Sequence, residues 1–276
     1  MKLVKSYSAR AFVTIIFPVL ALSACETVQT TQGGVVGVDR SQRMALSAQQ
    51  LDQAAAKQYV ELIAEEKKKN NVNRDPAQVA RVRTISNRLI AQTPAFRPDA
   101  KAWQWEVNVL TSAEVNAWCM PGGKIAVYTG LIDKLKVTDD ELAAVIGHEI
   151  SHALREHARE RASEKMVAGS VISIGSALLG VGSLGQQGAE YAYMGVIGLP
   201  NSREHEREAD RIGVELAARA GYDPRAAITL WQKMGQVGGS APPTFLSTHP
   251  SSADRTSDLA VYAQRVMPLY LQTKNR

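Results

Sequence analysis

Two histidines four residues apart, with a glutamate directly after the first, stand in the segment "IGHEISHALREH". Residues four apart lie on one face of a helix, so His148 and His152 can direct both imidazoles to one point. Glu149 is rotated by about 100° from His148 around the helix axis and falls at the edge of that point. This H-E-x-x-H arrangement is typical of zinc hydrolases, in which the glutamate accepts a proton from a water at the metal without binding the metal.

The alternative to a zinc site is a charged surface helix that contains this pattern by chance. The run "ELAAVIG", which precedes the histidines, is apolar, so they continue a buried stripe and do not lie on an exposed tail. Buried histidines need polar partners. We therefore expect His148 and His152 to bind zinc.

A catalytic zinc ion takes three protein ligands and a water, so a third donor must come from another segment. The segment "SREHEREAD", residues 202–210, offers four candidates: Glu204, His205, Glu206 and Glu208. It is also charged enough to be the solvated start of a helix. The residues alone leave this choice open.

The pattern E-x-x-A-D, formed by Glu206, Ala209 and Asp210, follows H-E-x-x-H here, and this pair of motifs resembles the HtpX-like and Oma-type zinc metallopeptidases. The segments "NAWCMPGGKIAVYTGLID" and "STHP" are similar to further elements of that family, so the resemblance extends over most of residues 75–255. It implies that Glu206 is the third ligand of one Zn²⁺ per chain and that Asp210 orients a ligand. It also implies a zincin-like (gluzincin) fold of the α+β class, predominantly helical, with a small sheet beside the zinc helix.

His249 precedes Pro250 in the proline-punctuated segment "PPTFLSTHPSSADR", and a following proline restricts the backbone. Composition alone favours an exposed loop, whereas the resemblance places His249 with Glu149 among the catalytic residues. It could donate a hydrogen bond to the oxyanion formed during attack. Alternatively, it could occupy the open coordination position of the zinc and keep the enzyme latent.

Three other reactive side chains are expected to take no part in catalysis. His157 follows His152 by five residues and points off the zinc face, so we expect it at the surface. His205 lies on a different face from Glu206. Cys119 has no histidine near it in sequence, and we expect a small buried residue beside a strand.

Helices and two strands must position these groups. Apolar spacing predicts helices over 47–69 and 75–92, the second capped by Asp75. "WQWEVNVL" and "KIAVYTGL" read as strands, and we expect an extended substrate to pair with the edge of the strand after Gly123. Further helices are expected from the following starts: Thr138 or Asp139 (running to about His157), Ser202, Asp223-Pro224 and Ser252.

The first 24 residues have a basic start, the apolar run "AFVTIIFPVLAL" and then "LSAC", which ends at Cys25. The run is short for a bilayer span and is typical of a secretory signal peptide. "LSAC" resembles the bacterial lipobox, whose cysteine is diacylated, and two acyl chains hold a protein stably on a membrane. Glu26 in the next position favours the outer membrane, facing the periplasm. The alternative is a plain signal peptide.

The predicted organisation is a lipoprotein signal peptide (1–24), a polar, glycine-bearing flexible tether (25–40) and a zinc metallopeptidase domain (41–276). A glycine- and alanine-rich stretch over 167–200 could be a transmembrane helix, but its glycines favour a helical flap over the cleft. Without the first 24 residues, 29 basic residues face 27 acidic ones, a net charge of +2. That balance does not favour a nucleic-acid partner.

These features predict a zinc endopeptidase of the bacterial envelope that acts on unfolded or misassembled proteins. One alternative is a zinc-binding, chaperone-like envelope protein with little proteolytic activity, which would be expected to lack Glu149. A structural lipoprotein without metal is the other, and the paired motifs oppose it. Substrate identity and oligomeric state do not follow from the sequence.

Overall fold

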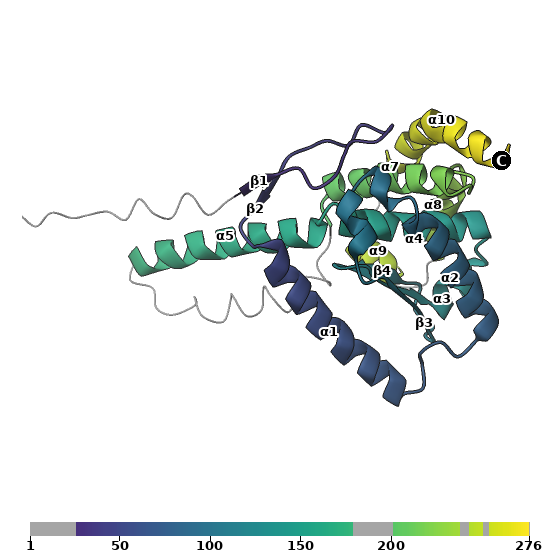
Figure 1. The fold of residues 1–276 in the computed structure, drawn as a ribbon. Coiled ribbons are helices and arrows are strands. Elements are labelled where there is room, and N and C mark those ends of the chain that lie inside the picture. Colours follow the sequence, from purple (N-terminus) through teal and green to yellow (C-terminus); the bar gives the residue numbers. More distant parts are fainter. Residues whose placement is uncertain (1–25, 179–200, 238–242, 251–253, 276) are drawn as a thin grey trace, which may run out of the picture.

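The computed structural model describes residues 26–178, 201–237, 243–250 and 254–275, and these are predominantly helical with two small sheets (Figure 1). The elements are β1 (Glu26–Val28), β2 (Gln42–Met44), α1 (Ala48–Lys68), α2 (Pro76–Ile90), the short 3₁₀ helices η2 (Thr93–Ala95) and η3 (Pro98–Ala102), β3 (Glu106–Leu110), β4 (Ala117–Met120), β5 (Lys124–Tyr128), α3 (Thr129–Leu135), α4 (Asp139–Leu154), α5 (His157–Leu178), α7 (Arg203–Arg219), α8 (Ala226–Gln236), α9 (Thr244–Thr248) and α10 (Arg255–Lys274). The predicted fold class is confirmed.

Helices α2, α4 and α7 begin where their capping residues predicted, whereas α8 begins at Ala226, after the predicted start at Asp223-Pro224. Asp75 caps α2 by accepting hydrogen bonds from two backbone N–H groups of the first turn. At the start of α4, Thr138 and Glu141 form a reciprocal capping box. The side chain of Ser202 accepts from the backbone of His205 and caps α7. Local hydrogen bonding therefore sets where both helices of the candidate site begin.

The three-stranded sheet has the order β3-β5-β4, with β5 parallel to β3 and antiparallel to β4. The strand after Gly123 is β5, which is central and paired on both sides. Our expectation that this strand offers a free edge to a substrate is therefore wrong. The outer strands of this sheet are β3 and β4, and β4 follows Asn116 and contains Cys119.

The N-terminal segment packs onto the domain before Ser41, where the sequence analysis placed the domain boundary. Strand β1 pairs with β2, and Val36 and Val38 are buried in the main hydrophobic core. The backbone N–H of Val36 donates to Glu215 Oε2 at 2.9 Å. Residues 26–40 are thus part of the folded unit. Cys25 and the leader lie outside the described residues.

Helix α5 continues to Leu178 and extends away from the body of the domain in Figure 1. Residues 179–200 lie outside the described part, so the expected flap stays a prediction. Within the described ranges, none of the helices combines the length and the apolar character that crossing a bilayer requires.

Helices α4 and α7 approach each other closely at two glycines. A Cβ atom added to Gly213 would lie 2.9 Å from the backbone nitrogen of His148 and 3.1 Å from the carbonyl carbon of Gly147. A Cβ added to Gly147 would lie 3.0 Å from the carbonyl oxygen of Gly213. The two backbones therefore meet directly next to the first histidine of H-E-x-x-H.

We predict that Gly213→Ala destabilises the protein, because the added methyl group pushes α7 away from α4. Overpacking of this kind costs about 1–3 kcal/mol, which exceeds the gain of up to about 1 kcal/mol from alanine in a helix. Gly235 in α8 is the matched control, because an added Cβ there meets open space. Urea unfolding should show a loss for Gly213→Ala and no loss for Gly235→Ala; equal free energies of unfolding would contradict the role given to the contact.

Candidate metal centre

Four buried side chains from three helical regions converge on one point. His148 and His152 of α4 direct their Nε2 atoms at each other, 3.0 Å apart. Glu206 of α7 lies with its carboxylate oxygens 3.5 Å from His148 Nε2 and 3.3 Å from His152 Nε2. The fourth member is His249, whose Nδ1 lies 3.0 Å from Glu206 Oε1. One potential ligand atom from each residue lies within 4.8 Å of the other three.

The outer nitrogen of each histidine of α4 has its own partner. Nδ1 of His148 lies 2.9 Å from Asp210 Oδ1, and Nδ1 of His152 lies 2.8 Å from His157 Nδ1. Both Nε2 atoms therefore point inward, towards the carboxylate of Glu206. Zinc sites hold their histidines in this way, with the ligating nitrogen facing the ion and the other nitrogen hydrogen-bonded behind it.

The charges around this point also suit a divalent cation. Glu149, Glu206 and Asp210 are three buried carboxylates, and two arginines, Arg255 and Arg161, balance only part of their charge. Within the described residues, Oε1 of Glu149 has no hydrogen-bond partner. Two imidazoles and a carboxylate form a donor set that zinc prefers. The residues present therefore fit a zinc ion.

The ionisation of these groups follows from burial and from their neighbours. Burial lowers the pKa of His148, but the charge of Glu206 and the hydrogen bond with Asp210 outweigh it and raise that pKa to about 9. Burial lowers the pKa of His152 well below its usual value. For Glu149, burial raises the pKa, although His249 and His148 oppose the shift. A carboxyl group with a raised pKa is better suited to exchange protons near neutrality.

Arg255 is a site residue that the sequence analysis missed. Its guanidinium lies 2.8 Å (Nη2) from Asp210 Oδ1 and 2.9 Å (Nη1) from Glu206 Oε2, so it links the two carboxylates of α7. The ring of Trp231 lies against the guanidinium, 3.3 Å from its centroid to Cζ. A single arginine after "STHP" carries no signal of its own in a sequence.

His249 is buried at the end of the short helix α9, unlike the exposed loop residue that composition alone favours. Phe245 is fully buried in the main core, and its ring stacks on that of His249 with centroids 4.3 Å apart. The amide of Asn201 lies 3.3 Å from His249 Nδ1 and donates to the carbonyl of Thr248. The structure therefore brings His249 to Glu149 and to the three candidate ligands.

A cleft of about 340 Å³ opens beside the candidate ligands. Its lining includes Glu149, His152 and His249 on one side and the whole of β4 on another. Arg161 also lines it and donates a hydrogen bond to Asn201. The exposed edge of β4 thus runs along a cavity that ends at the histidines.

Of the two other histidines, His157 lies in a place that its spacing did not predict, whereas His205 lies outside the candidate ligand group, as expected. His157 is fully buried, so the expectation of a surface residue is wrong. The chain leaves the helix at Glu156, which has a φ of 51°, and His157 begins α5 in a new direction. His205 is buried against His157, and it is not a member of the four-residue group around Glu206.

Cys119 lies in β4 and is partly buried, which agrees with its predicted place in the structure. Burial and the charge of Glu149 raise the pKa of its thiol well above the usual value. A thiol with a raised pKa is a poor nucleophile, because the thiolate is the reactive form.

Comparison with known proteins agrees with this geometry. The model of peptidase family M48 matches residues 76–263, and the chain belongs to this family, as the paired motifs predicted. The chain is 41% identical over 168 residues to mitochondrial metalloendopeptidase OMA1 of Arabidopsis thaliana, covering 56% of this chain and 31% of that protein.

Two further relatives match a larger share of the chain. Metalloendopeptidase OMA1 of Bos taurus is 32% identical over 222 residues, which cover 76% of this chain and 41% of that protein. The beta-barrel assembly-enhancing protease of Yersinia pestis is 29% identical over 206 residues, 70% of this chain and 40% of that protein. The chain thus spans less than half the length of these relatives.

We predict that Glu206→Gln weakens zinc binding by at least tenfold, because an amide is a poorer ligand than a carboxylate and leaves Arg255 with one partner fewer. Glu204→Gln is the control, since that side chain is 45% exposed and pairs with Arg207 on the surface. Competition with a chelator measures both affinities. Weaker binding by Glu204→Gln, with Glu206→Gln unchanged, would show that the third ligand is misplaced.

Proposed function

We propose that this chain is a zinc metalloendopeptidase in which His148, His152 and Glu206 hold one Zn²⁺. The observation that carries the proposal is the convergence of two inward-facing Nε2 atoms and a buried carboxylate, with Glu149 beside them at the end of a cleft. Asp210 and Arg255 hold the ligands from behind. Membership of peptidase family M48 supports the same reaction.

The chain's own residues divide the remaining tasks of peptide hydrolysis. When bound, zinc supplies Lewis acidity, which polarises a carbonyl group and lowers the pKa of a water. Glu149 accepts the proton of the attacking water at a carboxylate oxygen and then delivers it to the leaving amine. Burial raises the pKa of Glu149, which suits a carboxyl group that takes up a proton and releases it again.

The substrate is an extended, unfolded segment. Strand β4 has a free edge in the lining of the cleft, and an extended chain can add to such an edge through backbone hydrogen bonds. An unfolded segment offers those groups along its whole length, because they are not paired within secondary structure of its own. The relatives named as beta-barrel assembly-enhancing proteases support misassembled envelope proteins as the natural substrates.

The protein is a lipoprotein of the bacterial envelope, attached through diacylated Cys25 and facing the periplasm, with the outer membrane as its site. The support is the leader with its "LSAC" sequence and the glutamate that follows. Mass spectrometry of the mature N-terminus tests this: an unmodified Cys25, or a cut elsewhere, would end the lipoprotein proposal.

The second candidate function is a zinc-binding, chaperone-like protein with little proteolytic activity. The position of His249 favours it, because its ring lies between Glu149 and the ligands: its Nε2 is 3.4 Å from Glu149 Oε1 and its Nδ1 is 3.2 Å from His148 Nε2. A ring in this place excludes a water and a substrate carbonyl. Turnover would then require that the substrate displace His249.

We predict that Glu149→Gln retains zinc and loses at least 100-fold in the rate of cleavage of an unfolded protein. The amide cannot accept the proton of the water, and general base catalysis typically contributes about 10²–10⁴-fold. Zinc content and cleavage are measured on the same preparation, with Glu204→Gln as the control that should remain active. Full activity of Glu149→Gln would exclude the proposed mechanism.

We predict that His249→Ala raises the basal rate of cleavage and leaves the zinc content unchanged. The reason is that removal of the imidazole frees the place between Glu149 and the ligands. The measurement is the initial rate on a short unstructured peptide. A fall in kcat of about 10²-fold would instead assign His249 the role of an oxyanion donor, and an unchanged rate would remove His249 from the site.

A further inference from the structure

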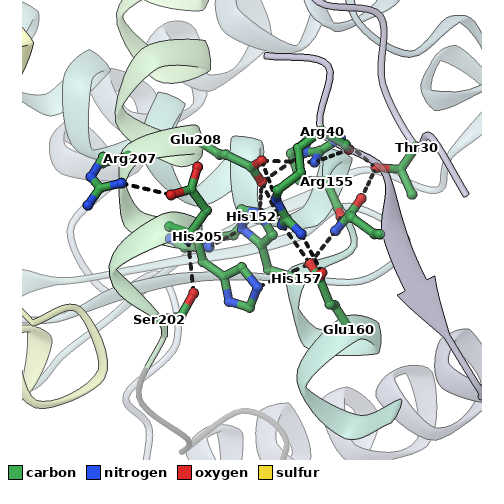
Figure 2. A network of polar contacts seen from close by, with 12 residues as sticks. Thr30, Arg40, His152, Arg155, His157, Glu160, Ser202, His205, Arg207 and Glu208 are labelled. Atoms are coloured by element: carbon green, nitrogen blue, oxygen red, sulfur yellow. Dashed lines mark hydrogen bonds and ion pairs between the residues drawn. The ribbon is translucent and has the colours of Figure 1, made fainter. Parts of the chain in front are cut away.

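A second group of buried polar side chains lies directly behind His152 (Figure 2). It contains His157, His205, Glu160, Glu208 and the guanidinium groups of two arginines. We propose that His157 and Glu208 position the zinc ligand His152 by holding its ring in one orientation and one tautomer. This inference rests on the zinc site proposed above, and it concerns His157, which lies outside both family motifs, and Glu208, which occupies an unspecified position of E-x-x-A-D.

Three side chains form a continuous chain of hydrogen bonds that ends on the metal ligand. His152 Nδ1 lies 2.8 Å from His157 Nδ1, and His157 Nε2 lies 2.9 Å from Glu208 Oε2. If Nε2 of His152 binds zinc, its Nδ1 carries the proton and donates to His157. Nδ1 of His157 is then the acceptor, so its proton is on Nε2 and is donated to Glu208.

Glu208 is a suitable end for this chain because its carboxylate is fixed. Arg40 Nε donates to Glu208 Oε1 at 2.8 Å, and Arg155 donates to both oxygens at 3.1 Å. The N–H groups of both guanidinium groups can only donate, so each oxygen of Glu208 acts as an acceptor in these contacts. The direction of proton donation therefore runs from His152 to Glu208 without ambiguity.

One of the two arginines that hold Glu208, Arg40, comes from the N-terminal segment. Arg40 precedes β2 and also donates to both oxygens of Glu160, at 2.7 and 2.9 Å. Gln42, in β2, donates to the carbonyl of Arg155 at 2.8 Å and to Glu160 Oε2 at 2.6 Å. Arg40 and Gln42 of the N-terminal segment thus take part in the proposed support of a zinc ligand.

Atoms of His157, Glu160 and His205 lie close enough to hold a second metal ion, but the contacts oppose one. Both ring nitrogens of His157 already have partners. Glu160 and Glu208 are balanced by Arg40 and Arg155, so a divalent cation would add charge to a neutral group. The cluster is therefore better explained as a support for His152 than as a second metal site.

A carboxylate that acts through hydrogen bonds on a ligating histidine raises the basicity of the ligand and limits its rotation. Loss of such partners typically costs about 10–100-fold in metal affinity or activity. His205 provides the matched control, because it stacks on His157 with centroids 4.3 Å apart and donates to Glu160, yet it makes no hydrogen bond with a candidate zinc ligand.

The test compares His157→Leu, His157→Gln and His205→Leu by zinc affinity, measured by chelator competition, and by thermal unfolding of the metal-free protein. We expect His157→Leu to lose about 10–100-fold in zinc affinity. His157→Gln should restore most of it, because a carboxamide can accept from His152 and donate to Glu208. His205→Leu should lower thermal stability but leave zinc affinity close to that of the wild type.

NMR of the imidazole nitrogens in the zinc-loaded wild type tests the same proposal without any variant, so its result does not depend on whether the variants fold. The expected result is that His157 carries its proton on Nε2 and His152 on Nδ1. A proton on Nδ1 of His157 would overturn the proposal, as would equal losses of zinc affinity in His157→Leu and His205→Leu. A second bound zinc that disappears in both variants would also overturn it. If the wild type binds no zinc at all, the proposed function fails instead.

Discussion

The close contact between Gly147 and Gly213 sets the distance between the two helices that carry the candidate ligands. Gly213, Asp210 and Glu206 are spaced by three and four residues and therefore lie along one face of α7. That face meets α4 backbone to backbone. As a result, Asp210 reaches His148 and Glu206 reaches His152 at hydrogen-bonding distance. A wider separation would leave buried charges without partners, which costs far more than the loss of a packing contact.

Two neighbouring clusters of histidine and glutamate differ in the balance between carboxylates and arginines. This balance distinguishes the candidate metal site from the network behind it. Around His148 the carboxylates outnumber the arginines, and the Nε2 atoms of the two histidines of α4 face each other. Behind it, the two carboxylates Glu160 and Glu208 meet two arginines, and both nitrogens of His157 are occupied. The same residue types thus form a candidate metal site in one case and, as we propose, a support for one of its ligands in the other.

The starts of several helices and the family motifs could be predicted from the sequence, because both depend on local rules. Capping residues and helical spacing act within a few positions, so the starts of α2, α4 and α7 and the pairing of His148 with His152 could be derived from neighbours in the chain. The choice of Glu206 needed the family motif. Asn201, Arg161 and Arg255 were not predicted, because their partners lie far away in sequence and a lone arginine or asparagine has no periodic signal.

The same limit explains the N-terminal segment and the sheet. The stretch over 25–40 is polar and contains glycines, which is typical of a linker, but Val36 and Val38 pack into the core and Arg40 is held by acidic residues from α5 and α7. Alternation identified β3 and β5, whereas the order β3-β5-β4 depends on pairing between strands. Which strand has a free edge therefore could not be derived from the residues of β5 alone.

Among the features that were not predicted from the sequence, the break between α4 and α5 has the largest effect on the candidate site. Glu156 adopts a left-handed conformation although no glycine, asparagine or proline marks the position, and its carboxylate pairs with Arg97 and Arg159. A helix that continued through this point would carry His157 off the zinc face, as the spacing alone predicts. Because the chain turns, His157 reaches back to Nδ1 of His152, and Arg161, one turn further along α5, lines the cleft. The positive φ of Glu156 therefore directs the start of α5 so that His157 contacts His152 and Arg161 lines the same cleft as His152.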